Sequence, residues 1–127
     1  MKVVLCHGSF RYPHYGHLLH FEEAKEYADI LVVSITADKF LAKPCIFDEW
    51  QRTKMLMALR VVDYVYICRE KTGVKAIRDI RPSVYFKGRD YKEKGVIKQE
   101  SDACKAVGAV IKYTTSKKYS STAVNGN

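Results

Sequence analysis

The sequence predicts an α/β fold in which a parallel sheet of about five strands carries helices on both faces. Short apolar runs rich in β-branched residues alternate with segments of helical periodicity along the whole chain. Such alternation is typical of parallel strands joined by right-handed helical crossovers. With 127 residues, no internal repeat and no linker, we expect residues 1–127 to form a single domain.

Three strands and two helices are expected in the first half of the chain. Val3–Cys6 and Ile30–Thr36 are apolar runs of the kind found in buried strands. A helix expected between them, at residues 16–27, places Leu18 and Phe21 on one face.

The next helix and strand follow a capping signal. Asp48 is a suitable N-cap for a helix that runs to about Leu59. Val61–Cys68 is again apolar and β-branched, and we predict it to be the third strand.

The second half of the chain continues the alternation. A helix is expected to begin at Thr72 or Gly73 and to end before Pro82, because the residue before a proline disfavours helical backbone. The fourth strand is expected at Val84–Phe86.

The last elements end the predicted domain. A helix over residues 98–107 is expected to stop at Gly108, which suits the left-handed conformation that closes many helices. The fifth strand is expected at residues 109–113, and the Ser-Ser-Thr segment at 120–122 reads as the start of another helix.

Composition excludes some functions and leaves others open. The net charge of +8 suits nucleic acid, an acidic membrane surface or a small polyphosphate. The basic residues are spread along the chain without a block of five, which makes nucleic acid an unlikely partner. Apolar runs fall far short of the roughly 20 residues that span a bilayer. Four scattered cysteines indicate free thiols, so we expect a cytoplasmic protein without a signal peptide.

Polar segments follow four of the predicted strands, at residues 7–17, 37–52, 87–91 and 114–122. The carboxyl ends of parallel strands share one edge of the sheet, where such folds bind their ligands. We therefore expect these segments to converge.

Two histidines, His14 and His17, lie where the first strand passes into the first helix. A helix N-terminus binds phosphate through its free N–H groups and its dipole, and imidazoles there can donate further hydrogen bonds. A zinc site is not favoured, because no Cys or carboxylate cluster has ligand spacing. We interpret His7 and His20 as bystanders, with His20 packing on its helix.

The chain resembles the cytidylyltransferase-like nucleotidyltransferases over nearly its whole length. His14, Gly16 and His17 match their HxGH motif, and Gly8, Ser9 and Phe10 match the segment before it. The further matching residues are Lys43, Arg52, Lys87, Gly88, Arg89, Asp90, Tyr91, Ser120, Ser121 and Thr122. The most similar groups are glycerol-3-phosphate cytidylyltransferases and the heptose-1-phosphate adenylyltransferase domain of ADP-heptose synthase.

The resemblance implies a Rossmann-like, doubly wound fold and transfer of a nucleotidyl group from CTP or ATP to a phosphorylated sugar or polyol. His14 and His17 would act on the α-phosphate, and Lys43 and Arg52 would hold the leaving pyrophosphate with Mg²⁺ on the phosphates. Alternatively, Arg52 pairs with Asp48 or Glu49 on its own helix. The resemblance also implies nucleotide-binding roles and a homodimer. The nucleotide-binding candidates are Gly8, Ser9, Phe10, Gly16, Lys87, Gly88, Asp90, Ser120, Ser121 and Thr122.

One position departs from the family pattern: Arg11 stands where the family usually has Asp. Arg11 either contacts a phosphate or points to solvent, and Arg11 and Asp38 are candidates for binding the acceptor. The sequence leaves CTP and ATP open. The alternative function is a catalytically weak nucleotide-binding or nucleic-acid-binding protein on the same fold.

Overall fold

The computed structural model describes residues 1–115. Its five parallel strands lie in the order β3-β2-β1-β4-β5. The strands are β1 (Val3–Gly8), β2 (Ile30–Thr36), β3 (Tyr64–Cys68), β4 (Val84–Lys87) and β5 (Val110–Tyr113). The helices are α1 (Tyr15–Lys25), α2 (Glu49–Met57), α3 (Val74–Ile80), α4 (Asp90–Lys94) and α5 (Lys98–Val107), with a short 3-10 helix, η1 (Asp38–Phe40).

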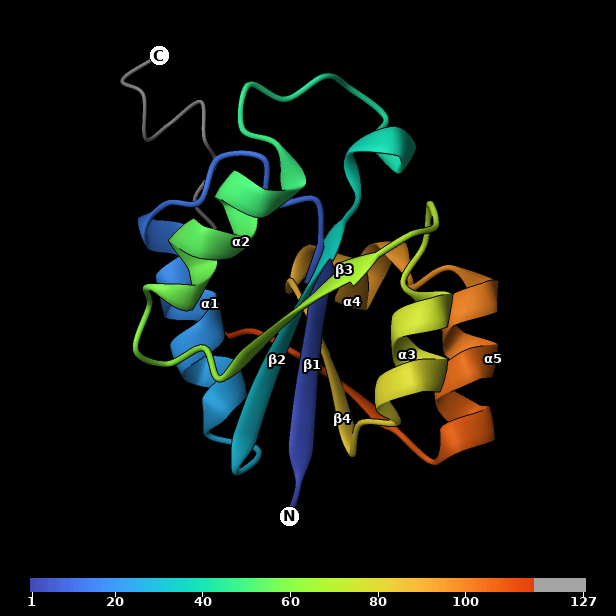
Figure 1. Ribbon diagram of the computed structural model, residues 1–127. Coiled ribbons are helices and arrows are strands. Elements are labelled where there is room, and N and C mark those ends of the chain that lie inside the picture. Colours follow the sequence, from blue (N-terminus) through green and yellow to red (C-terminus); the bar gives the residue numbers. More distant parts are fainter. Residues whose placement is uncertain (116–127) are drawn as a thin grey trace.

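Helices cover both faces of the sheet, so the predicted doubly wound α/β fold is confirmed (Figure 1). Helices α1 and α2 lie on one face, and α3 and α5 pack together on the other. Alternate side chains of the central strand β1 point to opposite faces of the sheet and pack into the two cores. Val4 and Cys6 belong to the core beneath α1 and α2, whereas Leu5 belongs to the core beneath α3 and α5.

The order of the strands reverses between β1 and β4. The chain leaves β1 for α1 on one face and leaves β4 for α4 and α5 on the other. Connections that diverge in this way open a ligand site at the carboxyl ends of the two strands. Leu5 is paired with Tyr85, so His7 and Lys87, each two residues further on, reach this edge together.

Two of the predicted helix boundaries are confirmed in atomic detail. The Asp48 carboxylate accepts from the Gln51 N–H at 2.8 Å, and the Gln51 side chain accepts from the Asp48 N–H at 2.9 Å, which is a capping box. Helix α5 ends at Gly108, whose φ of 77° is left-handed.

Other boundaries differ from the expectation. Strand β3 begins at Tyr64 rather than Val61, because Asp63 forms a separate link to β2: its carboxylate accepts from the Leu31 N–H at 2.8 Å. Val62 turns into the core instead of joining the sheet. Helix α4 and η1 were not expected, since each is too short to show a periodic pattern. Within residues 1–115, no helix is both long and apolar enough to cross a membrane.

Candidate active site

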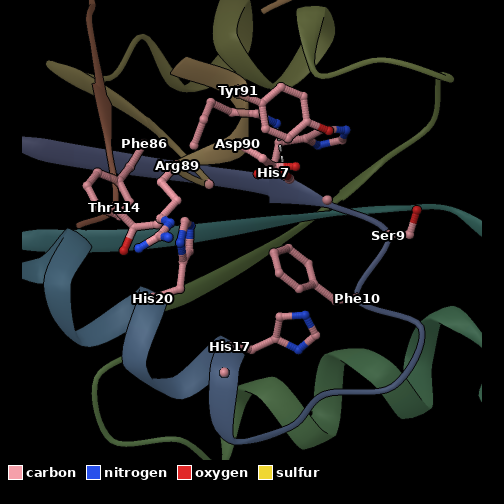
Figure 2. A pocket seen from close by; sticks show the side chains of 14 residues that line it. His7, Ser9, Phe10, His17, His20, Phe86, Arg89, Asp90, Tyr91 and Thr114 are labelled. Atoms are coloured by element: carbon pink, nitrogen blue, oxygen red, sulfur yellow. Dashed lines mark hydrogen bonds between the residues drawn. The ribbon is translucent and has the colours of Figure 1, made fainter. Parts of the chain in front are cut away.

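A cavity of about 250 Å³ lies between the carboxyl ends of β1 and β4, beside the start of α1 (Figure 2). It brings together two segments that are far apart in the sequence. The predicted site residues that line it are Gly8, Ser9, Phe10, Gly16, His17, Lys87, Gly88 and Asp90. The expected convergence is confirmed for residues 7–17, residues 87–91 and Thr114, whereas residues 37–52 do not line this cavity.

The two histidines of the HxGH motif form the N-terminal cap of α1. The Nδ1 atom of His14 accepts from the Gly16 N–H at 3.0 Å, and Nδ1 of His17 accepts from the His14 N–H at 3.2 Å. The two bonds make a capping box in which imidazoles replace the usual hydroxyl and carboxylate groups. The rings stack with their centroids 4.0 Å apart.

This cap also assigns the proton positions of both rings. A neutral imidazole that accepts at Nδ1 carries its proton on Nε2. Burial lowers the pKa of His14, and burial with the neighbouring His14 and His20 lowers the pKa of His17 to about 3. Both rings are therefore neutral at pH 7, and each has an Nε2–H that the cap does not use. The motif thus places two preoriented donors at the positive end of a helix.

Phe10 positions His17 from the loop that follows β1. Its backbone is left-handed, with a φ of 45°, which is uncommon for a residue with a side chain. Its ring meets His17 edge-on at 5.0 Å and lies 5.3 Å from Phe21. A Cβ on Gly8 would lie 3.1 Å from this ring, so the close approach favours glycine there. Strained backbone of this kind is typical of ligand-binding loops.

His7 and His20, interpreted as bystanders from the sequence, both line the cavity. The His20 ring does pack as expected, 4.9 Å from Phe86, and Nδ1 of His7 lies 2.8 Å from the Ser34 hydroxyl. Burial, helped by the charge of Lys87, lowers the pKa of each to about 4. The sequence contained a signal for the position of His20: it lies three residues after His17, so both side chains are on the same face of the helix.

A second cavity, of about 290 Å³, lies against the first, with α3 and α5 at its border. The wall between the two cavities contains His7, Gly8, Ser9, Lys87 and Tyr91, which line both. The second cavity adds Thr36, Lys71, Thr72, Ile97 and Glu100.

Glu100 is a buried carboxylate that the sequence did not single out, and it is 6 % exposed. It accepts from the Gly73 N–H at 2.8 Å and from the Tyr85 hydroxyl at 2.7 Å. A Cβ on Gly73 would lie 2.8 Å from that hydroxyl, so glycine lets α3 begin against this cluster.

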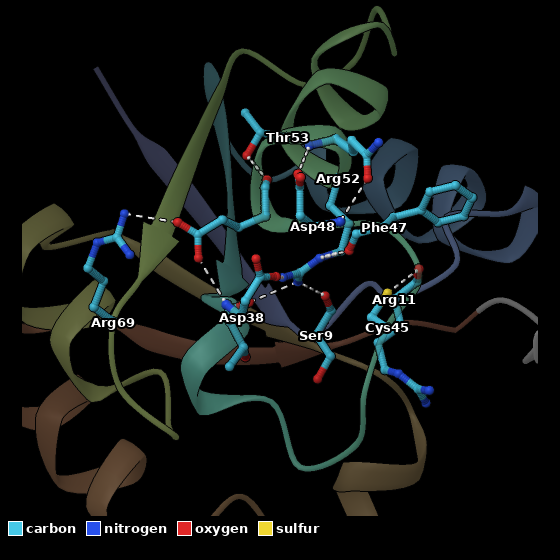
Figure 3. A network of polar contacts seen from close by, with 12 residues as sticks. Ser9, Arg11, Asp38, Cys45, Phe47, Asp48, Arg52, Thr53 and Arg69 are labelled. Carbon is cyan, nitrogen blue, oxygen red and sulfur yellow. Dashed lines mark hydrogen bonds and ion pairs between the residues drawn. The ribbon is translucent and has the colours of Figure 1, made fainter.

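Arg52 lies inside the protein, fully buried, and its guanidinium is hydrogen-bonded on all three nitrogens (Figure 3). It donates to the carbonyl groups of Ser9 and Thr36 at 2.8 Å, to that of Phe47 at 3.2 Å and to the Asp38 carboxylate at 2.7 Å. Arg52 thereby ties the loops after β1 and β2 to the start of α2.

The expected pairing of Arg52 within its own helix is wrong, because its ion pair is with Asp38 and Glu49 pairs instead with Arg69 at 3.0 Å. The guanidinium lines neither cavity, so a contact with pyrophosphate would require it to leave these acceptors. Asp38, a candidate for acceptor binding, is the partner of this arginine.

Arg11 is half-buried and contacts the loop that follows η1. Its Nη2 donates to the Pro44 carbonyl at 2.8 Å, and the Cys45 thiol donates to the Arg11 carbonyl at 3.2 Å. Its Nε is buried without a hydrogen-bond partner in the described part of the chain. Arg11 therefore holds the loop that carries Lys43. Lys43 itself is exposed, in a separate hollow with Asp38 and outside both cavities.

The segment that leaves β5 returns to α1. Thr114 lines the first cavity and donates to the Glu23 carboxylate at 2.6 Å, and the Thr115 N–H donates to it at 2.8 Å. Ser120, Ser121 and Thr122 lie outside the described residues.

Comparison with known proteins agrees with this site. The family model described as cytidylyltransferase-like matches residues 5–127. The chain is 36% identical to the bifunctional protein HldE of Geobacter metallireducens over 101 residues, which cover 76% of this chain and 21% of the relative. It is 36% identical to HldE of Helicobacter pylori strain P12 over 104 residues, 78% of this chain and 23% of the relative. The chain thus spans about a fifth of the length of these curated relatives.

Solved structures place the fold in the same group. The lipopolysaccharide core biosynthesis protein of Thermoplasma volcanium superposes with a TM-score of 0.75 at 27% identity, covering 94% of this chain and 99% of that one. Thermotoga maritima TmcAL, bound with alpha-thio ATP, shares the fold at 15% identity, with a TM-score of 0.65 and coverage of 99% and 50%. By its family match, its relatives and its site, the chain belongs to the cytidylyltransferase-like family of nucleotidyltransferases.

Proposed function

We propose that the chain transfers a nucleoside monophosphate from ATP or CTP to a small phosphorylated sugar or polyol, with release of pyrophosphate, to make an envelope or surface polymer precursor. The cap of α1 carries this proposal. His14 and His17 both use Nδ1 within the cap, which leaves two neutral Nε2–H donors at a helix N-terminus. His17 lines the cavity with Gly8 and Ser9, and His14, which is outside the cavity lining, stacks on His17 with ring centroids 4.0 Å apart. Donors in that place suit a phosphate that gains negative charge during reaction.

The reaction is a displacement at the α-phosphorus. An oxygen of the acceptor phosphate forms a new bond to that phosphorus, while the bond to the bridging oxygen breaks and pyrophosphate leaves with the electron pair. The attacking oxygen is already anionic at neutral pH, so the site needs donors and positive charge more than a base. His14 and His17 would donate to the α-phosphate, and loss of one such donor typically costs about 10²–10³ in rate.

The paired cavities support a reaction between two substrates. We assign the cavity beside α1 to the nucleotide, with the backbone of Gly8, Ser9, Gly16 and Gly88 close to it, and the second cavity to the acceptor. In-line displacement requires the attacking and leaving oxygens on opposite sides of the phosphorus. Substrates that meet at a shared wall can satisfy that requirement.

A sugar phosphate is the acceptor class that we favour. The similarity to the lipopolysaccharide core biosynthesis protein of T. volcanium supports a precursor of a surface polysaccharide as the product. Lys71 and Thr72 offer a charge and a hydroxyl at the second cavity, which suits a phosphate with a polar sugar.

Magnesium, assembly and location complete the proposal. Among residues 1–115 no cluster of three His, Cys, Asp or Glu side chains could hold a metal, so Mg²⁺ would enter on the triphosphate, and no step above depends on it. The four cysteines are unpaired, which fits a cytoplasmic setting. The exposed side chains of Ile46 and Trp50 offer apolar contacts for a homodimer, which sedimentation tests.

The function is tested by measuring pyrophosphate release with ATP and with CTP across a panel of sugar and polyol phosphates. We expect release with one nucleotide and a sugar phosphate, and none without the acceptor. Tight triphosphate binding with no release for any pair would contradict the proposal and support a nucleotide-binding protein instead.

A further inference from the structure

Lys87 stands in the wall between the two cavities. It is the last residue of β4, it is only 8 % exposed, and it lines both the cavity beside α1 and the cavity beside α3 and α5. A group in this position can reach a ligand from either side. This inference rests on the proposed function, in which the α-phosphate of the nucleotide reacts with the acceptor at this shared wall.

The ammonium of Lys87 is poorly satisfied by the protein. It has three N–H donors but makes one long hydrogen bond, 3.4 Å to the His7 carbonyl. Its other neighbours are the faces of Tyr91, at 4.5 Å, and Tyr85, at 5.3 Å. In the part of the chain that the structure describes, it has no ion pair with a carboxylate.

The nearby buried carboxylate does not supply the missing partner. Both oxygens of Glu100 are occupied, by the Gly73 N–H and the Tyr85 hydroxyl. A buried ammonium without a close counter-ion is costly, so its retention at a cavity indicates that an anionic ligand completes its shell. Its charge acts on both cavities, because it contributes, after burial, to the lowered pKa of both His7 and His20.

We propose that Lys87 is a catalytic residue that binds a non-bridging oxygen of the α-phosphate throughout the transfer. His14 and His17 are neutral donors, so Lys87 supplies the positive charge that these imidazoles lack. As the acceptor oxygen bonds to phosphorus and the bridging oxygen departs, negative charge grows on the non-bridging oxygens. An ammonium fixed at the shared wall stabilises that charge more in the transition state than in either bound substrate.

The test compares four variants by steady-state kinetics. Lys87→Met should lower kcat by about 10²–10³ while changing either KM by less than about tenfold. Lys71→Met, which removes a charge from the second cavity alone, should raise the acceptor KM and change kcat little. Lys105→Met, on the exposed face of α5, should change nothing. Lys87→Arg should recover part of the lost kcat.

Folding and function are separated within the same experiment. Lys87→Met should melt at or above the temperature of the unchanged protein, because it removes an unpaired buried charge. An active unchanged protein whose Lys87→Met variant keeps kcat within threefold would overturn the role of Lys87 and leave the proposed function intact. An unchanged protein that releases no pyrophosphate with any substrate pair would overturn both.

Discussion

Arg52 and Lys87 are two buried cations for which the family resemblance implied ligand-binding roles, Arg52 at the leaving pyrophosphate and Lys87 at the nucleotide, and the structure places them in opposite situations. Arg52 is fully buried and donates to three carbonyl groups and one carboxylate. Lys87 is 8 % exposed and has one long hydrogen bond beside two cavities. A buried cation whose nitrogens all donate to protein acceptors holds the fold together. One with unused donors beside a cavity is available to a ligand.

The largest expected effect is on stability, at Arg52. Arg52→Met removes every donor and leaves the Ser9 and Thr36 carbonyl groups without their partner. It should lower the free energy of unfolding by about 3–5 kcal/mol, since breaking a buried charged network leaves uncompensated polar groups. Urea unfolding measures this. A loss below about 1 kcal/mol would show that Arg52 is not a structural residue and would erase its contrast with Lys87.

The next effect is on rate, at the histidine pair. His17→Ala should lower kcat by about 10²–10³, because it removes an Nε2–H from the α-phosphate. His14→Asn is the matched variant: asparagine is a good N-cap, so it should keep the stability of α1 and still lose activity. Pyrophosphate release and thermal melting measure the two properties. A His17→Ala protein with full activity would restrict the motif to helix capping.

A smaller effect comes from pH. The pKa values of His7, His17 and His20 are lowered to about 4, 3 and 4, whereas the unfolded chain has values near 6.5. Between pH 6.5 and 4 the unfolded state therefore binds protons that the folded state does not, and stability falls as the pH falls. We expect each of the three histidines to contribute a loss of about 1.6 kcal/mol from pH 6.5 to 5.

Urea unfolding at several pH values measures this loss, and His20→Gln is the control, because it should reduce the slope. A stability that stays constant from pH 6.5 to 5 would contradict the neutral state assigned to these rings. Arg52, which has no histidine partner, should not contribute to the slope.

The smallest effect concerns Arg11, whose hydrogen bonding is intermediate between that of Arg52 and that of Lys87. It makes one bond to the Pro44 carbonyl and keeps a buried Nε without a partner. Arg11→Ala should cost about 1 kcal/mol or less and should speed amide hydrogen exchange in residues 41–47, which carry Lys43. Unchanged exchange in that loop would mean that Arg11 does not hold it.

The sequence predicted the fold class because hydrophobic periodicity is a local property and the right-handed crossover is a general rule. It did not predict the strand order, which depends on contacts between distant segments. The sequence also predicted that the HxGH motif and residues 87–91 lie at the same edge of the sheet, where the carboxyl ends of the strands meet. It could not show the partners of Arg52, because the carbonyl groups of Ser9 and Thr36 have no signature in the sequence and lie 43 and 16 residues away. For the same reason it could not show that Lys87 has no carboxylate partner within residues 1–115. The capping role of His14 and His17 was hidden because histidine is not a usual capping residue.

The most direct test of this contrast is a crystal structure with a non-hydrolysable nucleotide that carries a methylene group between the α- and β-phosphates. We expect a non-bridging α-phosphate oxygen about 2.7–3.0 Å from Lys87 Nζ. We also expect Arg52 to keep its bonds to Ser9, Thr36 and Asp38. A nucleotide bound with its phosphates on a displaced Arg52 guanidinium, and with Lys87 still against Tyr91, would contradict the account.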